Sequence, residues 1–210
     1  QNRLLVGTPT LGNIRMEWAA ARYGQVIPAN FSKVDMQQYM NSFIPMRYSV
    51  ADGQNLIVSE AVNKDYEWLL LIEDDTIPPH DAFVRFNEYI REKKYPIVSG
   101  LYFTRSEPAE PLVYRGRGNS YYKDWKLGEK IFVDGVPTGM LLLDMRLVKA
   151  LWEDSPEYIV SEGVRVRRVF ETPGKSWFNT EKGSLEMLTG TSDLDFCKRI
   201  IEGGYLKEHW

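Results

Sequence analysis

Apolar positions along the chain fall into short runs and helical stripes that alternate with one another. Runs typical of strands occupy residues 4–6, 26–28, 68–72, 96–100, 131–134 and 139–143. Segments with helical spacing lie between them, at residues 13–22, from 52 onward, and at 78–94, 146–152 and 192–202. The run 68–72 is apolar throughout, which is typical of a parallel strand buried on both faces. This alternation predicts an α/β fold in which helices flank a mostly parallel central sheet.

Polar residues and glycines mark the expected ends of the helices. Asn13 and Asp52 are candidate N-caps, whereas Gly24 and Gly203–Gly204 are expected to end the first and last helices. No repeat, low-complexity tract or linker-like stretch interrupts the chain, which predicts a single domain.

The composition limits the class of protein. The 210 residues carry 26 Lys and Arg against 29 Asp and Glu, a net charge of −3, and 43% of them are hydrophobic. These proportions exclude a disordered or fibrous chain. The single cysteine, Cys197, excludes a disulfide within the chain. No apolar run approaches the ~20 residues of a membrane span and no signal peptide opens the chain, so we expect a cytoplasmic protein.

Three acids, Glu73, Asp74 and Asp75, directly follow the most apolar run. Open α/β sheets bind their ligands outside the carboxyl ends of the strands. Adjacent carboxylates repel one another unless a cation neutralises them, and Mg²⁺ and Mn²⁺ prefer carboxylate and water oxygens. The segment therefore predicts a divalent metal site. The alternative is an acidic turn that caps the next helix.

Two further carboxylates, Asp193 and Asp195, stand at the start of the last predicted helix. A helix N-terminus stabilises negative charge, so helix capping accounts for this pair as readily as a catalytic role does.

Taken together, four segments resemble a nucleotide-sugar glycosyltransferase of the GT-A (Rossmann-like) fold, of the inverting, family-2-like type. The segments occur in the family's order and are residues 4–15, 68–79, 133–146 and 190–205. The resemblance covers most of the chain and implies one domain over residues 1–210. Residues 1–100 would form its nucleotide-binding half and residues 101–210 its acceptor and catalytic half.

The resemblance implies metal and ribose roles for the first acidic cluster. Asp75 matches the last acid of the family's DxD motif and would bind the Mn²⁺ or Mg²⁺ that bridges the donor diphosphate. Glu73 matches the first position and would contact the ribose or a metal-bound water. Asp74 lies between them and is a further candidate for the ribose.

The resemblance also implies a general base on the last helix. Asp193 matches the Asp of the family's xED motif, although Ser192 stands where the family has an acid, so Asp195 remains an alternative. Residues two apart on a helix point in different directions, so only one can face the acceptor, and we assign Asp193. The family often supplies a metal-binding His after this helix. His209 is the only candidate before the chain ends at Trp210, so either a further ligand lies beyond that residue or Asp75, phosphates and water hold the metal.

Nucleotide contacts are implied in the first loop and near the strand at 139–143. Thr8, Pro9 and Thr10 would line the base and ribose, and Arg15 would reach a phosphate. Gly139 would leave room for the donor sugar and the acceptor.

Asp52-Gly53-Gln54-Asn55 stands where the family has an Ala-Arg-Asn-like segment. The family's Arg is absent, so base contacts would fall to Asp52 or Asn55.

Two long segments, 105–130 and 153–190, are expected to be loops, the first with a hairpin, and to help choose the acceptor. Within the second, Trp177-Phe178 is either an aromatic platform for the acceptor or part of the core.

An alternating strand is expected at residues 165–168, with three arginines, Arg165, Arg167 and Arg168. They form either a solvated strand edge or a patch that binds a phosphate-bearing acceptor such as a modified nucleic acid.

The sequence thus predicts a metal-dependent glycosyltransferase that moves a sugar from a nucleoside diphosphate donor to an acceptor hydroxyl with inversion. A UDP-sugar is favoured over a GDP-sugar, and a saccharide is the favoured acceptor. The alternatives are a nucleotidyltransferase on a similar sheet and a non-catalytic module that binds sugar nucleotides. A nucleotidyltransferase would need a Gly-rich loop that carries Lys, and residues 7–12 contain no Lys.

Overall fold

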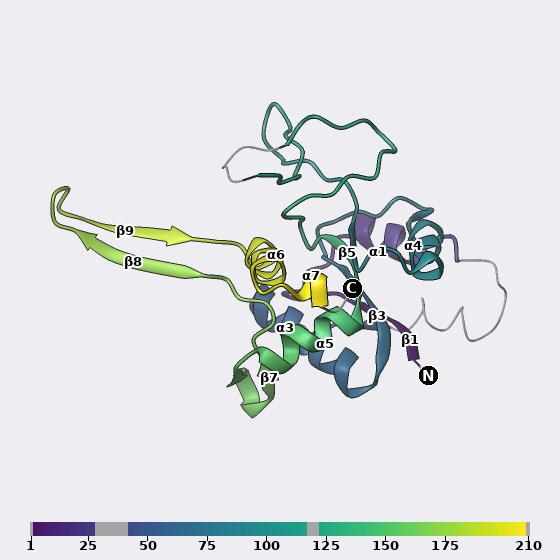
Figure 1. Ribbon diagram of the computed structural model, residues 1–210, viewed down its shortest axis with the longest axis horizontal. Helices are drawn as coiled ribbons and strands as arrows, with labels where there is room; N and C mark the ends of the chain where they lie inside the picture. The colour runs from purple at the N-terminus through teal and green to yellow at the C-terminus, as the bar shows by residue number, and fades with distance from the viewer. Residues whose placement is uncertain (1, 28–41, 117–121, 209–210) are drawn as a thin grey trace.

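The chain folds around a five-stranded sheet (Figure 1). The computed structural model describes residues 2–27, 42–116 and 122–208. The strands are β1 (Asn2–Gly7), β2 (Ser42–Phe43), β3 (Tyr66–Ile72), β4 (Ile97–Ser99) and β5 (Met140–Asp144), in the spatial order β2-β1-β3-β5-β4. β1 is parallel to β2 and β3, whereas β5 is antiparallel to β3 and β4. The sheet is therefore mostly parallel, as predicted, with one strand reversed.

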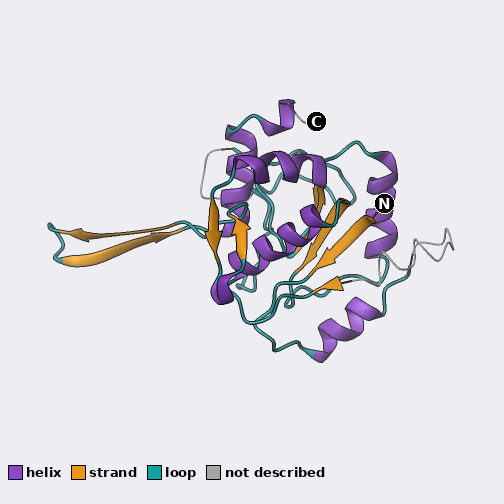
Figure 2. Cartoon of the chain, turned by 90° about the horizontal axis from the view of Figure 1, so that it is seen from below, coloured by secondary structure: helices purple, strands orange, loops and turns teal. Residues whose placement is uncertain are grey.

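Helices cover both faces of this sheet (Figure 2). α1 (Met16–Tyr23) and α4 (Ala82–Glu92) pack on one face, and α3 (Val50–Asn63), α5 (Met145–Asp154) and α6 (Ser192–Glu202) pack on the other. Successive side chains of a strand point to opposite faces, so β3 serves both layers. Trp68, Leu70 and Ile72 face α1 and α4, while Leu69 and Leu71 face the other helices. All five are at most 1% exposed, which confirms the prediction of a strand buried on both faces.

Two of the predicted strands are not formed. Val26 and Ile27 belong to a loop, in which the Val26 N–H donates to the carbonyl of His80 at 2.8 Å, and Pro28 lies outside the described residues. β2 takes the sheet edge beside β1 instead. Residues 131–134 do not form the predicted strand either. The next residue, Gly135, makes only an isolated antiparallel bridge with Tyr114.

The helix ends agree with the sequence in part. α6 spans Ser192–Glu202 and ends at Gly203, and Gly24 ends α1, as predicted. The predicted N-caps are wrong. Ser49 caps α3 by accepting from the N–H of Asp52 at 3.2 Å, and α1 starts after Arg15 without a side-chain cap.

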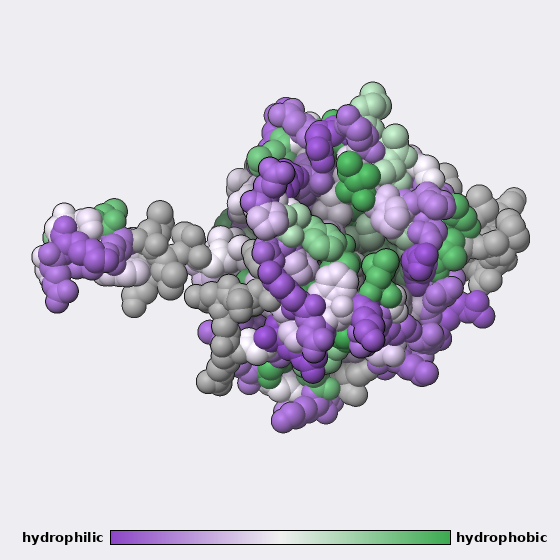
Figure 3. All heavy atoms as spheres, turned by 90° about the horizontal axis from the view of Figure 1, so that it is seen from above, coloured by the Kyte–Doolittle hydropathy of each residue, from purple (hydrophilic) through white to green (hydrophobic). Residues whose placement is uncertain are grey.

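The segment expected to be polar loops between 153 and 190 contains two small antiparallel pairs. β6 (Glu157–Ile159) pairs with β7 (Arg165–Arg167) around a 3₁₀ turn at Ser161–Gly163. β8 (Gly174–Asn179) and β9 (Ser184–Thr189) form a hairpin that projects as an arm from the body (Figures 1 and 3).

The remaining segments are a short helix and a long loop. α7 (Tyr205–Glu208) follows α6 and packs beside the core. Residues 105–116 and 122–130 form the expected loop. In place of a hairpin of strands, its described residues hold an isolated antiparallel bridge of Pro111 with Phe103, flanked by hydrogen bonds from the Thr104 N–H to the Glu110 carbonyl at 2.8 Å and from the Leu112 N–H to the Tyr102 carbonyl at 2.9 Å.

Candidate active site

The carboxyl ends of the parallel strands meet at one edge of the sheet. β1 ends there in the loop Thr8–Thr10, and β3 ends in Glu73–Asp75. Because β5 runs the opposite way, its first residues, preceded by Thr138 and Gly139, lie at the same edge. The topology therefore gathers most of the predicted site residues at the place where open α/β sheets bind ligands.

Glu73 is fixed at this edge by hydrogen bonds to its backbone and side chain. Its N–H donates to the carbonyl of Gly139 at 2.9 Å, and its carbonyl accepts from the indole N–H of Trp18 at 2.7 Å. The carboxylate accepts from the hydroxyl of Thr138 at 2.6 Å. One carboxylate oxygen of Glu73 is thus held in place by Thr138.

The environment of Glu73 disfavours its charged form. Burial raises the pKa of the Glu73 carboxyl from its ordinary 4.5 to about 7. The hydrogen bond from Thr138 lowers that pKa, whereas the negative charges of Asp75, Asp193 and Asp74 raise it further. Glu73 therefore lies among carboxylates, and added positive charge here would stabilise its ionised form.

Asp74 ties the end of β3 to the first loop. Its carboxylate accepts a hydrogen bond from the hydroxyl of Thr10, which in turn accepts from the N–H of Gly12 at 3.0 Å. In the same loop, Thr8 is 1% exposed and Pro9 packs against α3, where a Cβ added to Gly53 would lie 3.0 Å from Pro9 Cβ. The loop is thus clamped between the acids and α3.

Asp75 is the exposed member of the acidic cluster, and two guanidinium groups converge on it. Arg105 donates to its carboxylate at 3.0 Å, and Arg15 donates to its backbone carbonyl at 3.1 Å. Arg15 comes from the loop after β1, and Arg105 from the loop after β4. Two guanidinium groups therefore bind Asp75, one at its carboxylate and one at its backbone carbonyl.

Asp193 and Asp195 face different surroundings in the first turn of α6. Asp193 is close enough to Glu73 for its charge to raise the pKa of that carboxyl. Asp195 instead interacts with Arg199, Glu171 and Lys198, and burial raises its own pKa. Of the two, Asp193 is the one on the side of the strand-end acids.

Asn55 does not lie at this edge of the sheet. It is 1% exposed, its Oδ1 accepts from the N–H of Phe170 at 2.8 Å, and its Nδ2 donates to the Phe170 carbonyl and the Tyr158 hydroxyl. The carboxylate of Asp52 accepts from Tyr158 at 2.7 Å and from Ser49 at 2.7 Å. Asn55 has no atom free for a nucleotide in this arrangement, whereas Asp52 is only partly buried.

Gly139 is surrounded by protein atoms. A Cβ at this position would lie 2.5 Å from the Thr76 hydroxyl and 3.2 Å from the ring of Tyr102. Any larger residue at position 139 would therefore collide with Thr76 and Tyr102, and this packing alone explains the glycine.

A cleft of about 650 Å³ opens beside the acids, between α4 and the segment that follows β4. Glu73 and Asp75 are among its lining residues, together with the aromatic rings of Tyr89, Tyr102 and Phe103. Its charged residues include Arg105, which sequence reasoning did not select. No local signal distinguishes Arg105 from the other arginines of its loop, because only the fold brings it to Asp75.

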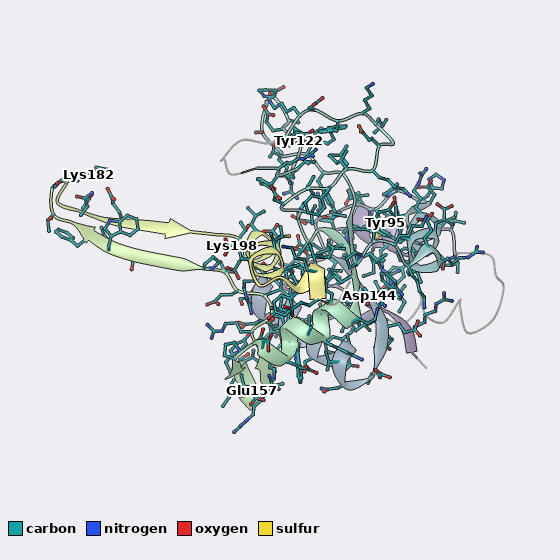
Figure 4. The ribbon with its side chains drawn as sticks, in the orientation of Figure 1. Tyr95, Tyr122, Asp144, Glu157, Lys182 and Lys198 are labelled. Carbon is teal, nitrogen blue, oxygen red and sulfur yellow. The ribbon has the colours of Figure 1, made fainter. Side chains whose placement is uncertain are left out.

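The aromatic pair Trp177-Phe178 lies on β8, in the projecting arm. Trp177 is 39% and Phe178 62% exposed, so neither belongs to the core. Lys182 marks the tip of the arm, which stands well clear of the body (Figure 4). The structure thus does not bring this pair to the strand-end acids.

Two of the three arginines around β7 bind to this chain itself. Arg167 lies over the ring of Trp152 at 4.5 Å and donates to the carbonyl of Glu153. Arg168 pairs with Glu171 at 3.1 Å. Arg165 is exposed.

Within the described ranges, no group of three His, Cys, Asp or Glu side chains is arranged to hold a metal ion. His80 is exposed, and His209 lies outside the described residues. No helix in the described part of the chain is both long and apolar enough to cross a membrane.

Comparison with known proteins concerns the fold alone. No family model matches the chain, and no curated protein matches it significantly. Among solved structures, the chain is similar to the crystal structure of A197 from STIV, with a TM-score of 0.52 and 19% sequence identity. The match covers 77% of this chain and 73% of that chain. At this identity the likeness lies in the arrangement of the backbone, which is that of a mixed α/β domain.

Proposed function

We propose that the chain is a metal-dependent glycosyltransferase of the GT-A type, which transfers a sugar from a nucleoside diphosphate donor to an acceptor hydroxyl with inversion. One observation carries the proposal. Glu73, which with Asp74 and Asp75 follows a buried strand, lies within electrostatic range of Asp193, which comes from a different element. A strand-end cluster for the donor and a separate carboxylate for the acceptor are the two parts that this reaction needs.

The residues present fit a divalent cation. Asp75 and Glu73 offer hard carboxylate oxygens among the residues that line the cleft. A site with one or two carboxylates suits a cation that keeps several waters and binds substrate phosphates. Mn²⁺ or Mg²⁺ would there act as a Lewis acid that stabilises charge on the departing nucleoside diphosphate.

The chain's own residues would do the remaining work. Asp193 would accept the proton of the acceptor hydroxyl, which makes the oxygen a better nucleophile as it attacks the anomeric carbon. Arg15 and Arg105 would bind diphosphate oxygens, since guanidinium groups favour such contacts. The aromatic cleft beside Asp75 would receive a sugar ring, whereas the buried side chains of Thr8, Pro9 and Thr10 are not open to the nucleoside.

Thermal unfolding with UDP-, GDP-, ADP- and CMP-sugars, each with and without Mn²⁺, tests the proposal. A ligand that binds the native state and not the unfolded chain stabilises it by RT ln(1 + [L]/Kd), so the melting temperature rises with ligand concentration. We expect a UDP-sugar with Mn²⁺ to give the largest rise, and a GDP-sugar the next. The absence of any rise with all four donors would contradict the proposal.

Donor hydrolysis separates an enzyme from a binding module. With Mn²⁺ and the donor that stabilises the chain most, we expect slow release of the nucleoside diphosphate even without an acceptor. Binding without hydrolysis, and without transfer to a panel of saccharides, would favour the non-catalytic alternative.

A further inference from the structure

A buried chain of hydrogen bonds runs from α3 to the first strand-end acid. Gln54 and Thr138 are 0% and 3% exposed. The amide nitrogen of Gln54 donates to the Thr138 hydroxyl at 3.0 Å, and that hydroxyl donates to Glu73 at 2.6 Å. Three segments far apart in the sequence therefore meet in one polar contact at the sheet edge.

The chemistry of the three groups fixes the direction of this chain. A threonine hydroxyl has one proton to donate, and Glu73 in the ionised form that would bind a cation can only accept. The Thr138 proton is therefore committed to Glu73, and its oxygen must accept from Gln54. Gln54 has to present its NH₂ group, which leaves its own buried oxygen without a hydrogen-bond partner among the described residues. An unpaired buried oxygen destabilises the fold. The contact between Gln54 and Thr138 is kept despite this cost.

The backbone around Glu73 does not need this contact. The N–H and carbonyl of Glu73 are already bound by Gly139 and Trp18, and β3 is paired along its length with β1 and β5. What Thr138 adds is the position of the carboxylate itself. The negative charges of Asp74, Asp75 and Asp193 act on the Glu73 carboxylate. The hydrogen bond from the Thr138 hydroxyl fixes the orientation of that carboxylate.

We propose that Gln54 and Thr138 are positioning residues that hold one oxygen of Glu73 and so present the other to the cation and donor. This inference rests on the proposed function, because it assumes that Glu73 contacts a bound ligand. Partners that orient a metal-binding side chain typically change metal affinity by about 10–100-fold when they are removed.

Two substitutions at Thr138 separate positioning from packing. Thr138→Val keeps the shape and loses the hydroxyl, whereas Thr138→Ser keeps the hydroxyl and loses a methyl group. Gln54→Met removes the amide from α3 and is the second test if Thr138→Val does not fold. The metal-free melting temperature of each variant reports its folding, and electron paramagnetic resonance of free Mn²⁺ measures its affinity in the presence of UDP.

We expect Thr138→Val to bind Mn²⁺ about 10-fold more weakly than the wild type, Gln54→Met to be weakened in the same direction, and Thr138→Ser to stay close to the wild type. If the wild type binds and Thr138→Val and Gln54→Met bind equally well, the positioning role is overturned while the proposed function stands. A lower melting temperature with unchanged Mn²⁺ affinity also overturns the positioning role, since it shows a packing role. A wild type that binds no Mn²⁺ with UDP overturns the proposed function and the inference with it.

Discussion

The guanidinium of Arg105 lies 3.0 Å from the carboxylate of Asp75. The acid that we assign to the metal is therefore already paired with a positive side chain. Both side chains are exposed, at 75% and 55%. An exposed pair contributes little, up to about 1 kcal/mol, and therefore opens easily. A cation and Arg105 would compete for Asp75, and the phosphates of the donor would give Arg105 a new partner.

Replacing Arg105 should therefore have opposite effects on the two ligands. We expect Arg105→Gln to bind Mn²⁺ alone up to about 5-fold more tightly, because about 1 kcal/mol of competing ion pair is lost. The same variant should bind UDP with Mn²⁺ more weakly, because a phosphate contact is lost. Isothermal titration calorimetry measures both, and Lys182→Gln, which breaks the exposed pair with Glu186 in the arm, is the control. Changes of the same sign for both ligands would contradict this competition.

Substitutions of Asp193 and Asp195 should have different effects on kcat, because the two carboxylates have different neighbours. We expect Asp193→Asn to lower kcat by roughly 10²–10⁴-fold with the donor Kd little changed, as the loss of a general base predicts. Asp195→Asn should retain most of the wild-type kcat, since Asp195 interacts with Arg199 and Glu171 instead. Steady-state kinetics and donor titrations of both variants check this. The reverse ranking of the two kcat values would move the base to Asp195.

Features of the fold that depend on neighbouring residues could be predicted from the sequence, and features that depend on contacts between distant residues could not. The strand at 68–72 and the helix Ser192–Glu202 were predicted correctly, because apolar runs, helical spacing and a terminal glycine pair are local features. The strand expected at residues 26–28 failed for Val26 and Ile27, since the N–H of Val26 bonds to His80, a contact that no local pattern contains.

The site shows the same division. The acids after β3 are recognisable in the sequence, whereas the partners of each acid come from other elements. Asn55 looks like a base-contacting residue by its place in a motif, yet it binds the backbone of Phe170, 115 residues away. Gln54 and Thr138 carry no chemical signature of their own, and the hydrogen bonds that join them to Glu73 form only when α3 and the segment before β5 meet there.

Gly7 should be intolerant of even one added methyl group. A Cβ there would lie 2.3 Å from Cγ2 of Ile57, which is 0% exposed in α3. We expect Gly7→Ala to lower the free energy of unfolding by about 1–3 kcal/mol, the usual effect of overpacking a core. Gly174→Ala is the control, since a Cβ at Gly174 would have no atom within 4 Å. Equal urea midpoints for the two variants would show that α3 can shift away from β1.

The pKa of Glu73 makes a prediction about stability and pH in the metal-free protein. Because burial raises that pKa from 4.5 to about 7, the folded chain binds the proton more tightly than the unfolded chain, and stability falls as the pH rises between these values. Glu73→Gln keeps an acceptor for Thr138 and removes the charge. We expect it to raise the free energy of unfolding above pH 7 by up to about 3 kcal/mol, a gain that shrinks to nothing as the pH falls toward 4.5.

Urea unfolding between pH 5 and 8 in the presence of a chelator measures this difference. Mn²⁺ with UDP should reverse the order at pH 8, because the wild type then regains a cation beside its carboxylate and the variant does not. A gain for Glu73→Gln that is the same at every pH would mean that the charge of Glu73 is not the cause. A gain confined to high pH that Mn²⁺ with UDP leaves unchanged would mean that the cation does not bind at this carboxylate.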